Sequence, residues 1–406
     1  MNRRDFLALM GTAAMAPRAF ADLPKRPVAG VVTIYKRNTH ADVILGKILE
    51  GYDQQGGHGP ALKLASLYID QPKSSHLGLE LAHKHRVPVF DTIEGAVRGV
   101  DGVISIGEHG DYPDDPKTGQ KLYPRRRFFD EIVAAYRKYG RVAPIFNDKH
   151  FCPAWADAKH MYDTARRMKI PFMAGSSIPV AWRLPELTLK RGTRIKEALA
   201  VGYGGPEAYA YHALEGLQCM VERRAGGETG VKSVQAVTGD AIWEAEAKGL
   251  WSMDLLMSAL RLHPKPKLDR LRERLRKNSP FYLIEYRDGT RGTVAMMNGV
   301  TGEFGFAARI EGETRLKATW IKLDYRAPFA HFAWLTQGIE HLIHHRKSPY
   351  PVERTLLTTG ILDRAIHSLV DNERRLVTPE LNVKYQPTDW GYADRDFPPV
   401  TQTLKK

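Results

Sequence analysis

The sequence has little cysteine and, after its first residues, no long apolar run. Only two cysteines occur in 406 residues, Cys152 and Cys219. Two are too few for a disulfide framework or for a cysteine-based zinc site, and they allow either one bridge or two buried thiols. No segment after residue 21 offers the 18 consecutive apolar residues that a membrane-spanning helix needs. The sequence therefore excludes a disulfide scaffold and predicts no stable membrane span.

Two hydrolase motifs are also missing. The turn Gly175-Ser176-Ser177 lacks the second glycine of a serine-hydrolase nucleophile elbow. The segment HLIHH at 341–345 places two histidines on one helical face but lacks the glutamate base of a zinc hydrolase. We expect these histidines to cap a basic helix end, and both hydrolase classes rank low.

The chain has an excess of basic residues. Its formal net charge is +14, which favours anionic neighbours such as phospholipid head groups, acidic glycans or a phosphorylated ligand. No nucleic-acid-binding motif accompanies the charge, so we expect no nucleic-acid partner.

The first 21 residues predict export. Arg3 and Arg4 precede an apolar stretch over residues 6–16, and small residues on either side of Phe20 suit a signal peptidase that cleaves after Ala21. The alternative is an amphipathic first helix, but that apolar run is too short to cross a bilayer. The pattern is typical of a twin-arginine signal peptide. We therefore expect the twin-arginine export machinery as a partner and a periplasmic or extracellular location.

Strand and helix patterns divide the remaining chain into two domains and an arm. Residues 22–175 alternate short apolar strands with helices, a spacing that predicts an α/β, Rossmann-like, doubly wound parallel sheet. Residues 176–378 are rich in β-type segments with hairpin turns such as Asp288-Gly289, which predicts an α+β domain with a mostly antiparallel sheet. Residues 379–406 are rich in proline and aspartate and predict an extended C-terminal arm.

Four short motifs accompany this order. Thr39-His40-Ala41 opens the first helix, Asp70 ends the second strand, NDKH stands at 147–150 and YHALEGLQ at 211–218. In domain order and motifs the chain resembles the glucose-fructose oxidoreductase / inositol dehydrogenase / MocA (Gfo/Idh/MocA) family over nearly all of its length after residue 21. The resemblance implies an oxidoreductase that acts on a sugar or sugar-like polyol with NAD or NADP.

The resemblance also assigns roles in proton transfer. It implies that Lys149 polarises or protonates the substrate oxygen and that His212 is the general base. Glu215 lies three residues from His212, on the same helical face, where it would orient the imidazole. His150 stands where the family has a proline and could share the proton task. From the residues alone, Lys149 can also be a surface lysine and His212 a core-facing histidine.

Further candidates for substrate contact lie in a loop and on a helix. The loop 107–127 is longer and more charged than the family's turn, and it follows a strand end, where open α/β sheets bind ligands. Glu108 and His109 would meet the substrate there, without a metal ion. Tyr209 and Tyr211 would line a sugar-sized pocket by stacking, or else fill an interface.

The turn between the first strand and the first helix departs from the family pattern. Residues 33–39 contain no glycine, although a Gly-x-Gly-x-x-Gly turn normally lets backbone amides hold the pyrophosphate. Tyr35 and Arg37 would meet phosphate through side chains, beside Thr39 and His40, while the resemblance places Asp70 at the adenosine ribose.

Two interpretations of function stay open. The first is the exported nicotinamide-dependent oxidoreductase. The second is a cofactor-free protein of the same fold, which is either a non-redox lyase or hydratase, or a sugar- or partner-binding protein. Family members pair through the open sheet face of the second domain, which implies a homo-oligomer.

Overall fold

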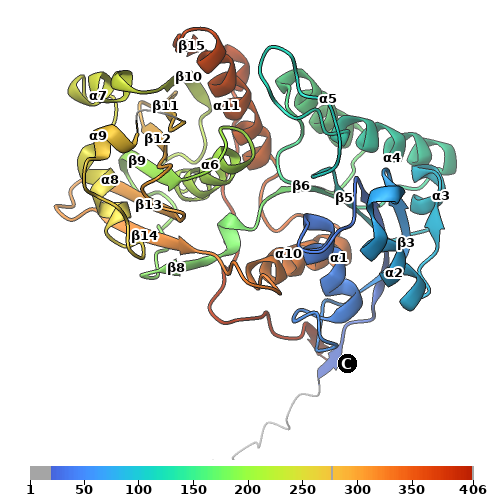
Figure 1. Ribbon diagram of the computed structural model, residues 1–406. Helices are drawn as coiled ribbons and strands as arrows, with labels where there is room; N and C mark the ends of the chain where they lie inside the picture. The colour runs from blue at the N-terminus through green and yellow to red at the C-terminus, as the bar shows by residue number, and fades with distance from the viewer. Residues whose placement is uncertain (1–19, 276–277, 405–406) are drawn as a thin grey trace, which may run out of the picture.

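The computed structural model describes residues 20–275 and 278–404. The predicted signal peptide lies, except for its last two residues, outside the described residues. At the start of the described chain, strand β1 (Phe20–Asp22) pairs antiparallel with strand β16 (Gln402–Leu404), so the two ends of the described chain lie side by side (Figure 1).

The N-terminal domain is built on a six-stranded parallel sheet in the order β4-β3-β2-β5-β6-β7. The strands are β2 (Arg26–Val32), β3 (Leu62–Ile69), β4 (Val89–Phe90), β5 (Gly102–Ile106), β6 (Ile145–Asp148) and β7 (Phe172–Gly175). The helices are α1 (His40–Glu50), α2 (His76–Lys84), α3 (Ile93–Val97), α4 (Arg125–Tyr139) and α5 (Trp155–Arg167), with the 3-10 turn η1 (Pro72–Ser74). The central strands are apolar on both faces because helices cover both. The predicted doubly wound parallel sheet is confirmed.

The second domain is built on an eight-stranded sheet in the order β15-β10-β11-β12-β9-β13-β14-β8. The strands are β8 (Trp182–Leu184), β9 (Ile195–Gly202), β10 (Val231–Val237), β11 (Phe281–Tyr286), β12 (Arg291–Met296), β13 (Phe304–Ile310), β14 (Lys317–Lys322) and β15 (Leu376–Val377). Among the described strands of this sheet, only β9 and β12 pair in parallel. Asp288-Gly289 forms the β11–β12 hairpin, where Gly289 has a φ of 87°. The predicted, mostly antiparallel sheet is confirmed.

Helices cover both faces of this sheet. Helices α6 (Ala208–Val221) and α11 (Glu353–Val370) pack on one face. Helix α8 (Met253–Leu260) packs on the other face of β9, β13 and β14, beside α7 (Asp240–Ala247) and the short α9 (Leu271–Arg274). The expectation of an open sheet face is therefore wrong for these strands, because an apolar cluster that includes Leu199, Val201 and Ala307 fills the space under α8.

Helix α10 (His331–His345) and the arm tie the two domains together. Although it follows the second sheet in sequence, α10 packs against α1 and β7 of the first domain (Figure 1). The arm passes η3 (Pro379–Leu381) and meets η2 (Ile178–Val180), where Ala393 N–H donates to Val180 O at 2.9 Å. Among the described helices, none is both long and apolar enough to span a membrane.

Candidate functional site

The strand ends of the first sheet bring together a buried ionic cluster. Glu108 follows β5 and Lys149 follows β6, and Lys149 Nζ donates to Glu108 Oε1 at 2.8 Å. Arg125, at the start of α4, donates to Glu108 Oε2 at 2.5 Å. All three side chains are at most 6% exposed. Burial alone would raise the pKa of Glu108, but the Lys149 and Arg125 charges hold it well below its usual range.

The backbone at Lys149 has an uncommon conformation. Lys149 has a φ of 62°, in the left-handed region that non-glycine residues seldom adopt. Its N–H donates to Gly175 O at 3.0 Å, so the end of β7 holds the residue in place. A lysine therefore occupies a left-handed backbone position, from which its ammonium group reaches the carboxylate of Glu108.

A histidine and an aspartate form a second pair beside this cluster. His40 Nδ1 lies 2.6 Å from Asp148 Oδ2, and the Asp148 side chain is fully buried. The other carboxylate oxygen, Asp148 Oδ1, has no hydrogen-bond partner in the described chain. The His40 ring packs edge-on against His109 and Phe332, with centroids 5.6 and 5.1 Å away. The carboxylate therefore fixes the orientation of the His40 ring.

His212 lies in the first half of α6 and faces these groups. Its Nδ1 is buried and has no hydrogen-bond partner among the described residues. Burial, then the charges of Lys149 and His40, hold the pKa of His212 well below its usual range. An uncharged imidazole with a free ring nitrogen can accept a proton. The structure thus places His212 within electrostatic reach of Lys149 and His40, although the three come from different parts of the chain.

Glu215 and His150 have other partners than expected. Glu215 is fully buried and accepts from Ser176 N–H at 3.2 Å and from the Thr358 hydroxyl at 3.2 Å. Its carboxylate therefore ties α6 to β7 and α11 and does not orient His212, which corrects the sequence-based expectation. His150 Nε2 lies 2.9 Å from an Arg125 nitrogen, and burial and that charge lower the pKa of His150.

The two predicted pocket tyrosines differ in exposure. Tyr209 is 42% exposed, and its ring centroid lies 6.3 Å from that of His212. Tyr211 is fully buried, with its ring 5.2 Å from that of His150. On the remaining side of His212, the Phe304 ring lies 6.1 Å away. Aromatic rings thus surround the imidazole, and Tyr209 provides the exposed part of this wall.

The turn after β2 does not form a phosphate cradle. Tyr35 is fully buried, and its ring packs against Gly78 of α2. The expectation that Tyr35 meets phosphate is corrected, because its side chain lies in the core. Asn38 has a φ of 63°, and its N–H donates to the Asp42 carboxylate at 2.8 Å. The Asn38 amide, which lies just before α1, is therefore bound by the Asp42 carboxylate and does not point to a ligand phosphate.

The other two turn residues are near the surface. Arg37 is exposed. The Thr39 hydroxyl donates to Lys36 O at 2.7 Å and makes no cap hydrogen bond to α1. In the described chain, no other protein group orients the side chain of Arg37 or Thr39 toward the place where a phosphate would bind. Arg37 remains free to reach an anion at the surface, but it is not part of a built pocket.

Asp70 already accepts from three protein donors. The hydroxyls of Tyr68 and Tyr112 donate to its two oxygens at 2.6 and 2.7 Å, and Arg127 pairs with it at 2.5 Å. Although burial alone would raise the pKa of Asp70, these hydrogen bonds and the arginine lower it. In dinucleotide-binding folds an acidic residue at this strand end accepts from one or two ribose hydroxyl groups, but here protein donors already occupy both oxygens, and only one lone-pair site on Oδ2 is left.

The long loop closes the same edge of the sheet. Gln71 and Asp111 exchange two hydrogen bonds, of 2.7 and 3.0 Å, between the end of β3 and the loop. Thr33 donates to Glu108 O at 2.6 Å. The turn after β2 contains no glycine, one of its backbone amides is bound by the Asp42 carboxylate, and Asp70 is already bound by protein donors. These features do not fit a nicotinamide dinucleotide held in the usual way.

Some functional candidates were missed by sequence reasoning. Asp148 stood within the NDKH motif without a role, and Arg125 stood without a role in the charged loop predicted over residues 107–127. Glu207 Oε1 lies 3.6 Å from His150 Nε2, and His331, at the start of α10, is 4% exposed. The available signal was their position: Arg125 and Glu207 lie at or beside helix starts, and Asp148 ends a central parallel strand.

The two cysteines are free, and the two histidines of the HLIHH segment stack on each other. Cys152 and Cys219 are both free and buried, so the pair is not bridged. Over residues 20–275 and 278–404, no group of three or more histidine, cysteine, aspartate or glutamate side chains is arranged to hold a metal ion. His341 and His345 instead stack on each other, with ring centroids 4.5 Å apart.

Comparison with known proteins identifies the fold. No protein-family model and no curated protein sequence match the chain. Among solved structures, GenD2 from gentamicin A biosynthesis, in complex with NAD, superposes with a TM-score of 0.56 at 13% identity, over 89% of this chain and 99% of that one.

Two further solved structures also superpose on this chain over most of its length. The apo scyllo-inositol dehydrogenase from Lactobacillus casei gives a TM-score of 0.53 at 11% identity, over 88% of this chain and 99% of that one. A probable dehydrogenase from Thermotoga maritima gives 0.53 at 9% identity, over 87% and 99%. The resemblance expected from the sequence is confirmed at the level of the two-domain fold.

Proposed function

We propose that the chain is an acid–base enzyme that acts on a sugar or sugar-like polyol between its two sheets, without a dinucleotide in the usual cradle. The observation that carries the proposal is the convergence of the His40–Asp148 pair and the uncharged, unpartnered His212 on the Lys149–Glu108–Arg125 cluster. Acid–base chemistry needs groups of this kind within reach of one substrate.

The reaction class is the elimination or addition of water. In the elimination direction, His212 takes a proton from a substrate carbon next to a carbonyl group. The bond from the following carbon to its hydroxyl breaks with its electron pair, and the hydroxyl leaves as water after it gains a proton from His40. Lys149 and Arg125 stabilise the negative charge that develops on the carbonyl oxygen. No hydride acceptor is needed, because the total oxidation level of the substrate is unchanged.

The proposal is tested with a panel of sugars, keto sugars and sugar acids and no added nucleotide. We expect a subset to lose water, which the ultraviolet absorbance of the unsaturated carbonyl product reports. His212→Asn and His40→Asn should each lower the rate by about 10²–10⁴-fold. His83→Asn is the matched control, because His83 is an exposed residue of α2. An unchanged rate in both site variants would contradict the proposal.

A nicotinamide-dependent dehydrogenase is the second candidate. Its support is the fold shared with GenD2, which was crystallised with NAD, and with the scyllo-inositol dehydrogenase. In that case Lys149 and His212 would handle the hydroxyl proton as hydride leaves, and the nucleotide would have to bind without the glycine turn. Reduction of added NAD or NADP by a polyol would favour this candidate over the elimination.

Export is part of the proposal. The paired arginines and the apolar run over residues 6–16 support a twin-arginine signal peptide, so that the enzyme would act outside the cytoplasm. The test is a fractionation of the native host, in which replacement of Arg3 and Arg4 by lysine should leave the protein in the cytoplasm.

A further inference from the structure

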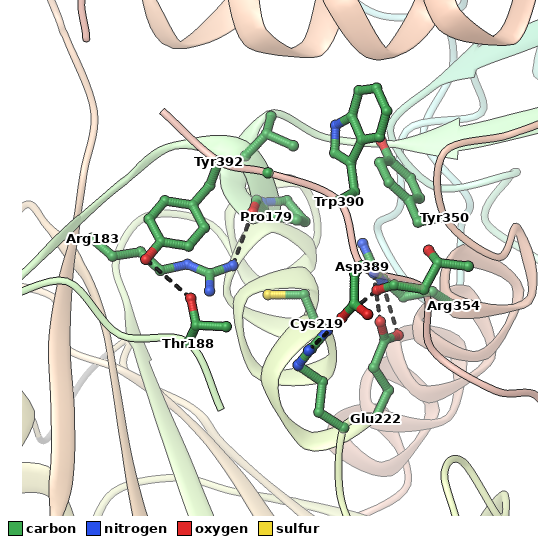
Figure 2. Close-up of a pocket in the computed structure, with 14 residues that line it drawn as sticks. Pro179, Arg183, Thr188, Cys219, Glu222, Tyr350, Arg354, Asp389, Trp390 and Tyr392 are labelled. Carbon is green, nitrogen blue, oxygen red and sulfur yellow. Dashed lines mark hydrogen bonds and ion pairs between the residues drawn. The ribbon is translucent and has the colours of Figure 1, made fainter. Parts of the chain in front are cut away.

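A cavity of about 330 Å³ lies at the C-terminal end of α6, whereas His212 lies in the first half of that helix. Its walls are η2, the C-terminal end of α6, the start of α11 and residues 388–392 of the arm (Figure 2). Cys219 lies in this wall two helical turns after His212, about 10 Å along α6. The cavity is therefore separate from the proposed reaction site.

The cavity contains an arginine without a carboxylate partner. Arg183 donates to Leu187 O at 2.9 Å and to Pro179 O at 3.1 Å, and the ring of Tyr392 covers its guanidinium at 4.1 Å. Within the described residues, no aspartate or glutamate forms an ion pair with Arg183. A guanidinium has five N–H donors, so three remain for a ligand. Burial lowers the pKa of Arg183, in line with a charge that lacks its counter-ion.

The two other arginines in the wall are neutralised. Arg354 binds both oxygens of Glu222, at 2.8 and 2.5 Å, and both side chains are buried. Arg223 pairs with Asp389 at 2.7 Å, and Asp389 also pairs with Arg191, outside the wall, at 2.8 Å. The wall itself contains three arginines and two carboxylates, so one positive charge remains there, and Arg183 is the arginine without a carboxylate partner. A dianion such as phosphate would also meet the nearby carboxylates of Glu222 and Asp389, so a single negative charge matches the site better.

Aromatic rings complete the wall. The Tyr350 side chain is 2% exposed, and its hydroxyl is shielded from solvent, so Tyr350 contributes packing and not a polar contact to the wall. Trp390 and Tyr392, from the arm, stand over the cavity in Figure 2 and offer flat apolar faces. The volume is at the lower end of the range for small-molecule sites.

We propose that this cavity binds a small monocarboxylate with a hydroxylated ring, the chemistry of a uronic acid. The carboxylate pairs with Arg183, and the ring lies against Trp390 and Tyr392. Arginine suits this role because its planar fork matches a carboxylate. Because the arm supplies one wall, the ligand also holds the arm against η2.

The test is calorimetric titration of the whole chain with D-glucuronate, D-glucose and inorganic phosphate. We expect glucuronate to bind at least about tenfold more tightly than glucose or phosphate. Arg183→Gln should weaken glucuronate binding by about tenfold or more. The exposed Arg194, which pairs with Glu311, provides the matched control Arg194→Gln, which should bind as the unaltered chain does.

Two more variants locate the ligand. Tyr392→Leu removes the ring that covers the Arg183 guanidinium, so it should keep the fold and weaken binding, which keeps the test decisive even where Arg183→Gln does not fold. His212→Asn should leave binding unchanged, since its side chain belongs to the other site. The proposal is overturned by equal binding of glucose, by tighter binding of phosphate, by no binding of glucuronate, or by binding that His212→Asn abolishes and Tyr392→Leu does not change.

Discussion

His40 Nδ1 and Asp148 Oδ2 lie 2.6 Å apart, although 108 residues separate them in the sequence. The aspartate is buried at the end of a central strand, and the histidine opens the first helix. The carboxylate accepts the Nδ1 proton, so in the protonated ring, where both nitrogens carry protons, the Nε2 proton is the one left to the substrate. This relationship gives the proposed proton donor a fixed direction.

Asp148→Asn should therefore lower the turnover of the proposed reaction by about 10²–10⁴-fold while the chain stays folded. The amide keeps the size of the side chain but removes the negative charge that holds the proton on His40 Nδ1. Initial rates and the circular dichroism spectrum measure the two effects. Asp157→Asn, at a largely exposed ion pair with Arg126, is the control, and a full rate in Asp148→Asn would remove the pair from the mechanism.

Glu108→Gln should destabilise the protein by about 3–5 kcal/mol, because it leaves Lys149 and Arg125 buried without their shared counter-ion. Urea unfolding at neutral pH measures this change. Glu131→Gln removes an exposed pair with Arg127 and should cost about 1 kcal/mol at most. Equal losses in the two variants would mean that the buried cluster is not ionised as described.

Stability should fall as the pH falls below about 6.5, in part through His331. Burial, with the charges of Lys47 and His40, lowers the pKa of His331 to about 3. The unfolded chain then binds a proton that the folded chain does not, so this stability is complete above about pH 6.5 and is lost as the pH falls toward the folded pKa. His331→Asn should reduce the loss between about pH 7 and pH 5 by on the order of 1–2 kcal/mol. An unchanged pH dependence of stability in His331→Asn would contradict this role of His331.

Gly78→Ala should destabilise the chain by about 1–3 kcal/mol. A Cβ atom at Gly78 would lie 2.5 Å from the Cβ of Tyr35, so the tyrosine ring or helix α2 must move. Thermal unfolding measures the loss, and Gly302→Ala, which meets open space, should change little. Tyr35→Ala should cost less stability in the Gly78→Ala variant than in the unaltered chain, because it removes the ring that the new methyl group would meet. Additive losses of stability would mean that the Tyr35 ring does not pack against Gly78.

The sequence predicted the fold further than it predicted the site. The alternation of strands and helices in residues 22–175 and the Asp288-Gly289 hairpin follow from local patterns, which is why both sheets were predicted correctly. The covered face of the second sheet was not predicted, because α8 reaches it through contacts distant in sequence. Local patterns carry no information about such contacts.

The same limit applies to the site. Lys149 and His212 stood out by motif, and the structure places them within electrostatic reach of each other. The partners of Glu215, Asp70 and Tyr35 could not be predicted, because each depends on a side chain from another element. The absence of glycine from the turn was visible in the sequence, but the engagement of Asp70 by Tyr112 became visible only in three dimensions.

The central claim is that this site performs acid–base chemistry without a dinucleotide, and one measurement tests it most directly. Protein purified from its native export pathway is denatured, the released small molecules are examined by mass spectrometry and ultraviolet absorbance, and NAD and NADP are titrated into the native chain. We expect no nicotinamide nucleotide and no binding. Recovery of a nicotinamide nucleotide in near-stoichiometric amount would contradict the account and favour the dehydrogenase.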